Sequence, residues 1–465
     1  MADYCVYWIR RTQDELRPCT SADPVAGRAG LVGTQNIRNN QSRVGGLDYV
    51  VAGGAVIEAV DSQPWSGEAN VHVSIVNWIK TTDAAVLPKS RRLWFRAEED
   101  NVIRRKRGSG SAAKQYDLNY REVKFINAAL SDAVDVSGAA ALRCNTEPQR
   151  VFQGVTPGHD GFLLSAEAKQ EILTRQPNCS EVIHPYLGGD EVLSGNAIPT
   201  RFLIDFGQLT LLQAQVYGPA FRRIERLVLP DRMATVEKGK DSAGEIRSDH
   251  RQLVDRWWHL WRARPDMMSV IGRLPRYLVC SRVTKRPIFA FLDASIRPGD
   301  ALQVFAFADD YSFGILQSNA HWTWFVAKCS KLTERFRYTP ESVFDTFPWP
   351  QTPTDAQVDA VANAGRAIRA IRTTALASTK GGLRAIYRTL DLPGANPLRD
   401  AHMALDDAVR SAYGFSKRAD LLADLLALNR SVAGTFNLSG EPVGPGVPPS
   451  YPQPERLVTT DCLGI

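Results

Sequence analysis

The sequence has no run of eighteen consecutive apolar residues, which is about the length that a helix needs to cross the hydrocarbon core of a membrane. It also begins without a basic stretch followed by an apolar one, so we expect neither membrane insertion nor export, and a cytoplasmic location. The seven cysteines stand alone, with no C-x-x-C pair and no histidine at ligand spacing. This pattern predicts neither a zinc site nor a disulfide framework.

The composition is ordinary for a globular protein, and 465 residues leave room for two or three domains. The formal net charge of +6 is mild, so the local clustering of charge is more informative than the total. Arg104, Arg105, Lys106 and Arg107 form a basic run directly before GSGS. Such a run is either a solvated linker or a loop that faces phosphates.

Residues 1–80 combine helical and strand patterns. MADYCVYWIRRTQDEL has helical spacing, and the apolar runs AGLVGTQNIRNN, LDYVVAGGAVIEAVDSQPW and NVHVSIVNWIK are typical of strands. In the last run, Val71, Val73, Ile75 and Ile79 alternate with residues that include Trp78, so Trp78 is expected on the opposite face of the strand. The order predicts the second half of an α/β sheet that ends in a hairpin.

Three further regions and a tail follow. Residues 81–150 are predicted to be a connector with a basic linker and a short helix, and residues 151–350 an α+β domain. In that domain Ser165 is the expected N-cap of a helix. Residues 351–438 are predicted to be helical, with Val361, Ala364, Ile368 and Ile371 on one stripe and Arg366 and Arg369 turned away from it. Residues 439–465 are rich in Pro and Gly and are expected to form a poorly ordered tail.

Several motifs, in order, carry a resemblance to a known family. ADYCVYWIRR, AGLVGTQNIRNN and VDSQPWSGEANVHVSIVNWIK resemble the part of gamma-class, S-adenosylmethionine-dependent DNA adenine methyltransferases that follows the catalytic Asn-Pro-Pro-Tyr/Phe motif. Within that class the chain resembles the MmeI-type restriction-modification enzymes. VFQGVTPGHDGFLLSAEAK, HPYLGGDEVLSG, RFLIDFG, RYTPESVFDTFPWP and LDDAVRSAYGF are similar to the target-recognition and C-terminal regions of those enzymes.

The resemblance implies the second half of a Rossmann-like methyltransferase sheet over residues 1–80, a DNA target-recognition domain over 151–350 and a helical C-terminal domain over 351–438. It implies S-adenosylmethionine as cofactor and double-stranded DNA as partner. The donor-binding Gly-rich turn and the Asn-Pro-Pro-Tyr/Phe motif are absent from this sequence. We therefore expect no catalytic residues in the chain, and a separately encoded N-terminal methyltransferase half is a candidate partner. The alternative is a DNA-binding specificity module, or an inactive truncated relic.

The resemblance also implies roles for particular residues. Trp78 matches the aromatic residue that stacks on the flipped base, although a lone Trp is more often a core residue. Asn36 and Lys80, at strand ends, are candidates for substrate contact. In SKLTERFRYT, Thr333, Glu334 and Arg335 match a base-reading stretch. In SRVTKRP, Arg282, Lys285 and Arg286 are candidates for phosphate contact, as is the basic run at 104–107; a solvated turn is the alternative.

Overall fold

The computed structural model describes residues 3–38, 40–65, 71–96, 118–132, 134–136, 138–194, 198–239, 250–329, 331–332, 335–379, 381–435 and 442–463. The chain divides into two compact units, Met1–Gly138 and Ala139–Ile465. None of the described helices combines the length and the apolar content needed to cross a membrane.

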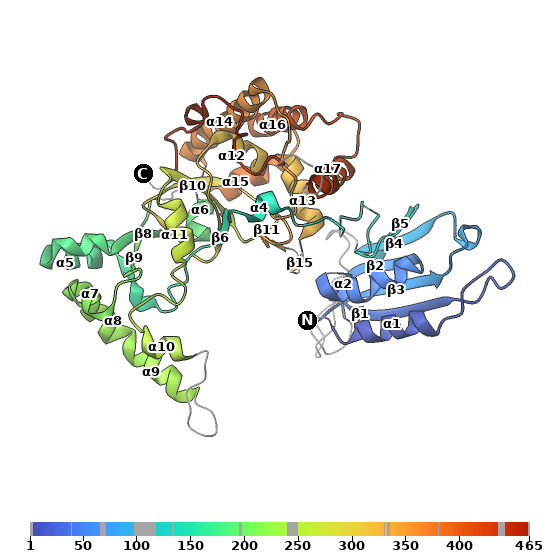
Figure 1. Cartoon of the computed structure of the whole chain (residues 1–465), viewed down its shortest axis with the longest axis horizontal. Coiled ribbons are helices and arrows are strands. Elements are labelled where there is room, and N and C mark those ends of the chain that lie inside the picture. The colour runs from blue at the N-terminus through green and yellow to red at the C-terminus, as the bar shows by residue number, and fades with distance from the viewer. Residues whose placement is uncertain are drawn as a thin grey trace, which may run out of the picture. The chain divides into compact units, whose positions relative to one another are not determined.

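Unit 1 is a five-stranded sheet with helices on one face (Figure 1). Its elements are α1 (Cys5–Glu15), β1 (Arg28–Thr34), α2 (Asn40–Gly45), α3 (Leu47–Ala52), β2 (Gly54–Pro64), β3 (His72–Lys80), β4 (Arg91–Arg96) and β5 (Leu118–Val123). The strand order is β1-β3-β2-β4-β5. The expected helix and the β2–β3 hairpin are present, but the first half of the second apolar run forms α3 rather than a strand.

The expected connector is part of this sheet. β4 pairs in parallel with β2, and β5 pairs antiparallel with β4, so the sheet continues to Val123. The ordered segment LNYREVKFINAAL, in which the short helix of the connector was expected, begins with the strand β5, and the short helix α4 lies further along the chain at Arg143–Thr146. Of the four strand pairings in the described sheet, only β2–β4 is parallel. β1, β2 and β4 therefore run in one direction and β3 and β5 in the other, and the Rossmann-like half-sheet implied by the resemblance stays a prediction.

The core of unit 1 lies between the sheet and the helices. α1 buries Val6, Ile9 and Gln13, which recur on one side of the helix at helical spacing. Ile9 packs in one cluster with residues of α3 and of the sheet, among them Leu47, Val50, Val56, Ala59, Val76, Trp78 and Leu93. This face of β3 is the one that carries Trp78.

Unit 2 begins with mixed α and β structure. Its first elements are α4 (Arg143–Thr146), β6 (Val151–Gln153), β7 (Leu163–Ser165), α5 (Ala166–Arg175), β8 (Ile183–Leu187), α6 (Gly189–Ser194), β9 (Arg201–Ile204), α7 (Leu211–Gln215), α8 (Gly218–Leu227), α9 (Leu229–Lys238), α10 (Arg251–Asp255), α11 (Pro265–Ile271), β10 (Arg276–Ser281), β11 (Val283–Thr284), β12 (Ala290–Asp293), β13 (Arg297–Pro298) and β14 (Leu302–Phe305). Ser165 caps α5 as predicted, because its hydroxyl accepts a hydrogen bond from the Ala168 amide.

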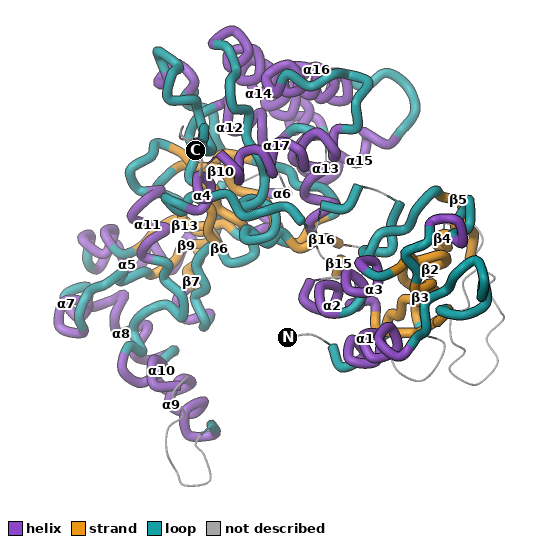
Figure 2. The backbone as a smooth tube through the Cα atoms, turned by 45° about the vertical axis from the view of Figure 1, so that its right-hand side comes forward, coloured by secondary structure: helices purple, strands orange, loops and turns teal. Residues whose placement is uncertain are grey.

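Helices dominate the rest of unit 2. They are α12 (Asp310–Gln317), α13 (Asn319–Lys328), α14 (Asp355–Ser378), α15 (Gly382–Arg388), α16 (Pro397–Tyr413) and α17 (Leu421–Thr435), with the short strands β15 (Lys331–Leu332) and β16 (Arg335–Arg337) between α13 and α14. The described strands of unit 2 form three small sheets, ordered β12-β10-β14-β6, β13-β8-β9-β7 and β11-β16-β15. In Figure 2, α12 to α14 and α17 gather on one side of these strands, and α7 to α10 on another.

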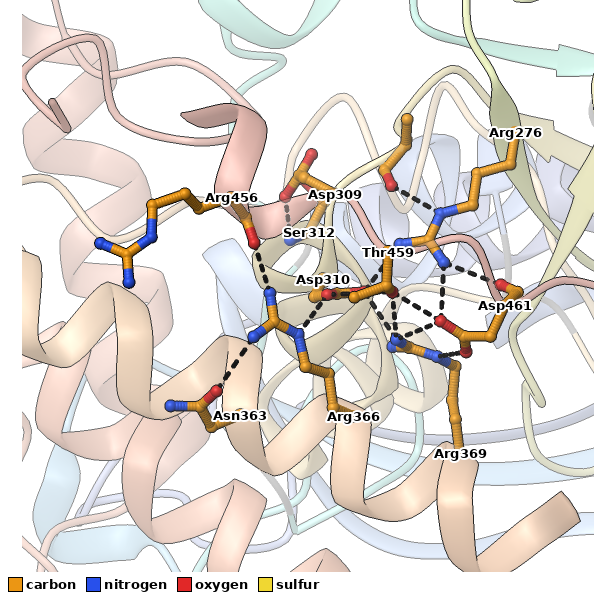
Figure 3. A network of polar contacts seen from close by, with 11 residues as sticks. Arg276, Asp309, Asp310, Ser312, Asn363, Arg366, Arg369, Arg456, Thr459 and Asp461 are labelled. Atoms are coloured by element: carbon orange, nitrogen blue, oxygen red, sulfur yellow. Dashed lines mark hydrogen bonds and ion pairs between the residues drawn. The ribbon is translucent and has the colours of Figure 1, made fainter. Parts of the chain in front are cut away.

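Periodicity predicted the helical part well. In α14, Val361 and Ile368 are fully buried, and α16 ends where Gly414 adopts a left-handed backbone with φ of 70°. The prediction for Arg366 and Arg369 is wrong. Both guanidinium groups point inward and form ion pairs with the fully buried carboxylate of Asp310 (Figure 3).

Asp310 receives a third guanidinium group. Nη2 of Arg276, on β10, lies 2.7 Å from Oδ1 of Asp310, and Nη2 of Arg369 lies 2.6 Å from the same oxygen. A buried carboxylate is costly unless cations and donors satisfy it. This cluster therefore ties β10 and α14 to the first turn of α12.

The expected disordered tail is packed against this cluster over its described residues 442–463. Asp461 binds both Arg369 and Arg276, and the Thr459 hydroxyl lies 3.2 Å from both carboxylate oxygens of Asp310. The Leu463 amide donates to the carbonyl of Phe291 on β12. Composition misled the prediction, because Pro and Gly limit helices and strands but not tertiary contacts.

Candidate nucleic-acid interface

One small sheet joins the two segments for which DNA contacts are predicted. β11, from SRVTKRP, pairs antiparallel with β16, from SKLTERFRYT, with Val283 opposite Arg337 and Thr284 opposite Phe336. β16 in turn pairs with β15, which places Leu332 opposite Arg335. Segments about fifty residues apart in the sequence thus form one surface element.

The structure shows only part of the predicted base-reading stretch. Arg335 is the first residue of β16, so its backbone is fixed by pairing with β15. Thr333 and Glu334 lie outside the described residues. The reading role of all three residues stays a prediction.

Buried aromatic residues support β16 from behind. Tyr338, fully buried directly after the strand, donates its amide hydrogen to the carbonyl of Arg282 at 2.8 Å. Its ring stacks on Phe325 of α13 with a centroid distance of 5.5 Å, and its hydroxyl lies 2.9 Å from Nε2 of His321. The Cys329 thiol donates to the carbonyl of Arg337 at 3.2 Å. A site on this sheet would therefore rest on a rigid support.

The three phosphate candidates of SRVTKRP have different surroundings. Lys285 is exposed, and its role as a phosphate contact stays a prediction. Arg282 is half-buried, and its Nη1 donates to the carbonyl of Asp300 at 3.2 Å.

Arg286 contacts two aromatic rings. Its guanidinium carbon lies 4.5 Å from the ring centre of Trp322 on α13 and 5.7 Å from that of Tyr387 on α15. Cation–π contacts of this kind attach the turn after β11 to the helices. The side chain is thus held within the protein by these rings, and its role as a phosphate contact stays a prediction. The other predicted basic run, Arg104 to Arg107, lies outside the described residues.

Sequence reasoning missed three arginines around Arg282. The positive charges of Arg337, Arg264 and Arg262 act on Arg282, whose pKa is lowered first by burial and then by these charges, while the carboxylate of Asp300 raises it. The available signal was the pair of arginines in WRARP and the last residue of RFR. Only the fold brings them together.

A hollow of about 650 Å³ lies beside β11. It is lined by residues of β8, α6, β9, β10, β11 and α15, namely Tyr186, Gly188, Gly189, Asp190, Glu191, Ser194, Arg201, Ser281, Val283, Ala301 and Arg384. Within it Arg201 pairs with Glu191 and Arg384 with Asp190. The charges of the lining are thus balanced, in contrast to those around Arg282.

In unit 1, Trp78 is a core residue in this structure. It does lie opposite the face of Ile79, as the alternation predicts, but that face is covered by α1. The ring has no exposed surface, and its Nε1 donates to Oε1 of Gln13 on α1 at 2.9 Å. No side of the ring is free for a base in this arrangement, so the stacking role stays a prediction that requires α1 to move.

Asn36 and Lys80 make structural contacts. Asn36 follows β1, and its Nδ2 lies 3.3 Å from Oδ1 of Asp3. Lys80 ends β3, and its Nζ donates to the carbonyls of Gln13 and Asp14 near the C-terminus of α1. A cation at this end of a helix is favourable. These contacts explain both residues without a substrate.

The opposite face of the unit 1 sheet holds a hollow of about 250 Å³, lined by Glu58, Ala59, Val60, Ile75, Asn77, Trp94 and Leu118. Nε1 of Trp94 donates to Oε1 of Glu58 at 2.8 Å, and its ring lies 4.7 Å from that of Tyr120. Across the described part of the chain, no group of three or more His, Cys, Asp or Glu side chains is placed to hold a metal ion.

Comparison with known proteins bears on the region that contains β10, β11, β15 and β16. Residues 271–351 match the family model described as the target recognition domain of MmeI. A solved structure of the Type IIL restriction-modification enzyme MmeI in complex with DNA resembles 93% of this chain at a TM-score of 0.66 and 20% sequence identity. The likeness shows a similar fold. The chain spans about half of that protein, since the match covers 51% of it.

A second solved structure, of the type IIG restriction endonuclease BpuSI, matches 83% of this chain and 47% of its own at 11% identity. Its TM-score of 0.28 is too low to support an argument about the fold. No curated protein matches the sequence.

Proposed function

We propose that this chain is the DNA target-recognition part of a restriction-modification or phage-defence enzyme that methylates adenine at N6 with S-adenosylmethionine. The observation that carries the proposal is that the match to the MmeI target recognition domain, over residues 271–351, includes β11, β15 and β16. Those strands pair the predicted base-reading segment with the predicted phosphate segment. The major groove of duplex DNA admits a two-stranded β-ribbon, such as the β11–β16 pair.

The methyl donor does not fit the described residues of unit 1. β2 and β4 are the parallel pair of this sheet. The next described element after β2 is the strand β3, and the next after β4 is the strand β5, so neither leads into a described helix. A donor site of the Rossmann kind needs a glycine-rich turn that leads from a parallel strand into a helix. We propose that donor binding and catalysis belong to a methyltransferase half outside these 465 residues, such as a separately encoded partner.

A specificity module without methyl transfer is the second candidate. The observation that favours it is the mainly antiparallel sheet of unit 1. The two candidates share DNA recognition by unit 2 and differ in whether unit 1 joins a catalytic partner.

The test is selection of preferred sites from a pool of random duplexes. We expect the chain to enrich one short motif. If Arg335 reads a base, Arg335→Ala costs about 1–3 kcal/mol at one base pair and relaxes the preference there. Lys285→Ala should instead weaken binding to all sequences alike, because a phosphate contact reads no sequence.

Arg418→Ala is the matched control, since Arg418 is exposed and lies in the helical part beyond residues 271–351. Failure of the wild-type chain to enrich any motif would refute sequence-specific recognition. An Arg335→Ala variant that keeps the same preference at every position would remove Arg335 from the reading residues.

A further inference from the structure

Four arginines from three segments of unit 2 lie near one another: the carboxylate of Asp300 acts on Arg264 and Arg282, and the charges of Arg262 and Arg337 act on Arg282. Arg262 and Arg264 lie before α11, Arg282 lies between β10 and β11, and Arg337 ends β16. Arg262 and Arg337 are exposed, whereas Arg264 and Arg282 are half-buried.

Hydrogen bonds through Gln153 and Asp300 hold the two half-buried arginines in place. Oε1 of Gln153, the last residue of β6, accepts a hydrogen bond from Nη2 of Arg264 at 3.0 Å. Nε2 of the same Gln153 donates to the carbonyl of Asp300 at 3.2 Å. That carbonyl also accepts from Nη1 of Arg282 at 3.2 Å. The two guanidinium groups are therefore oriented in advance.

The backbone fixes the two exposed arginines. Arg262 exchanges two backbone hydrogen bonds with Thr156, both 3.0 Å long. Arg337 stands opposite Val283 in the β11–β16 pair. Val283 directly follows Arg282 in the sequence. All four arginines thus project from paired or bonded backbone rather than from free loops.

The cluster carries an excess of positive charge. The charges of Arg262 and Arg264 both act on Arg282, the charge of Arg262 acts on Arg264, and Asp300 is the carboxylate that opposes them. Arginine remains charged at neutral pH, so four positive charges lie near one another, and Asp300 is the carboxylate whose charge acts on Arg264 and Arg282. Nε of Arg264 and Nε of Arg282 are buried without an acceptor among the described residues. Repulsion within the cluster and unused donors both favour the binding of an anion.

We propose that Arg262, Arg264, Arg282 and Arg337 form a phosphodiester-binding site that holds the backbone of duplex DNA beside the β11–β16–β15 sheet. This inference rests on the proposed function and extends it to Arg262, Arg264 and Arg337. The anion belongs to DNA because Arg337 lies two residues from Arg335 on the same strand, so the site flanks the predicted reading position. Planar guanidinium groups suit phosphate oxygens, with which they form paired hydrogen bonds.

The experiment compares the salt dependence of DNA binding in the full chain. Arg262→Gln with Arg337→Gln removes two exposed charges and spares the half-buried pair, so the fold is retained. We expect affinity for the preferred duplex and for a scrambled duplex to fall by the same factor. The slope of log K against log salt concentration should become shallower by about 0.9 for each lost contact. Arg388→Gln with Arg418→Gln removes the same charge from exposed positions of the helical part and should leave the slope unchanged.

The outcomes separate this site from the proposed function. Absence of DNA binding by the wild-type chain would refute both. Binding with a slope that the Arg262 and Arg337 changes leave intact would refute the site and leave DNA recognition standing. Competition with inorganic phosphate distinguishes the source of the anion. If micromolar inorganic phosphate displaced DNA from the wild-type chain but not from the double variant, the site would belong to a free anion and the proposal would fail.

Discussion

Asp310 and Arg276 form an ion pair 2.7 Å long in which both side chains are buried, with 0% and 2% of their surface exposed. Arg369 and Arg366 form further ion pairs with the same carboxylate. Such a pair contributes little net stability compared with an apolar replacement, but the loss of one partner leaves charges buried without compensation. The cluster is therefore sensitive to single substitutions.

Asp310→Asn should lower the free energy of unfolding of unit 2 by about 3–5 kcal/mol, because three guanidinium groups lose their common carboxylate. Urea denaturation followed by circular dichroism measures it. Asp190→Asn is the control, since 94% of the Asp190 side chain is exposed in its pair with Arg384 and exposed pairs contribute about 0–1 kcal/mol. An Asp310→Asn loss no larger than that of the control would contradict the structural role of the cluster.

Buried histidines should make stability depend on pH. Burial lowers the pKa of His321 to about 3, that of His402 to about 3 and that of His184 to about 4, from 6.5. The pKa of each of these histidines is lower in the folded than in the unfolded protein, so their contribution to the free energy of unfolding is greatest above pH 6.5. As the pH falls from 6.5 towards 3, the unfolded chain binds more protons than the folded protein, and the free energy of unfolding decreases. Burial raises the pKa of Asp345 and Asp406 to about 6, which acts in the opposite direction between pH 3.8 and 6.

The contribution of His321 can be isolated with His321→Gln. The difference in unfolding free energy between wild type and variant should shrink as the pH falls from 6.5 to 4.5, by up to about 1.4 kcal/mol per pH unit. Denaturation curves at several pH values measure it. A difference that stays constant over this range would mean that His321 does not stay neutral in the folded protein.

Trp78→Ala should cost unit 1 about 3–5 kcal/mol, because it opens a cavity beneath α1 and leaves Gln13 without its partner. Trp65→Ala, at a Trp with 45% of its surface exposed, should change stability by less than about 0.5 kcal/mol. Thermal denaturation compares them. Unchanged stability together with lost DNA affinity in the Trp78 variant would favour the stacking role over the core role.

Calorimetric titration of the chain with S-adenosylmethionine should show no saturable binding, with or without duplex DNA present. The reason is that the described strands of unit 1 provide no glycine-rich turn from a parallel strand into a helix. A one-to-one complex in the micromolar range would overturn this expectation. It would also show that the chain has a donor site that the sequence motifs do not reveal.

The periodicity of apolar residues within a segment correctly predicted those structures that depend on contacts within that segment. The helix α1, the β2–β3 hairpin and the apolar stripe of α14 all follow from spacing within one element. The errors concern partners that are distant in sequence. Arg369 was expected to point to solvent because its carboxylate, Asp310, is 59 residues away, and β4 and β5 were missed because their strand partners define them.

The same limit applies to the candidate interface. The sequence indicated SRVTKRP and SKLTERFRYT separately, and the structure pairs them as β11 and β16. The ring contacts of Arg286 were not foreseen because Trp322 and Tyr387 come from two helices distant in sequence. Arg262 and Arg264 were missed because nothing in their own segment shows that Arg282 lies near them.

The shared carboxylate of Asp310 has a mechanical consequence. It holds β10 and α14 through ion pairs with Arg276 and Arg369, so the central sheet of unit 2 and its helices cannot slide past each other without separating buried charges. If the chain recognises DNA as proposed, β10 and α14 should keep their relative positions on binding, and bending that brings bases to β16 would have to come from the DNA or from other elements.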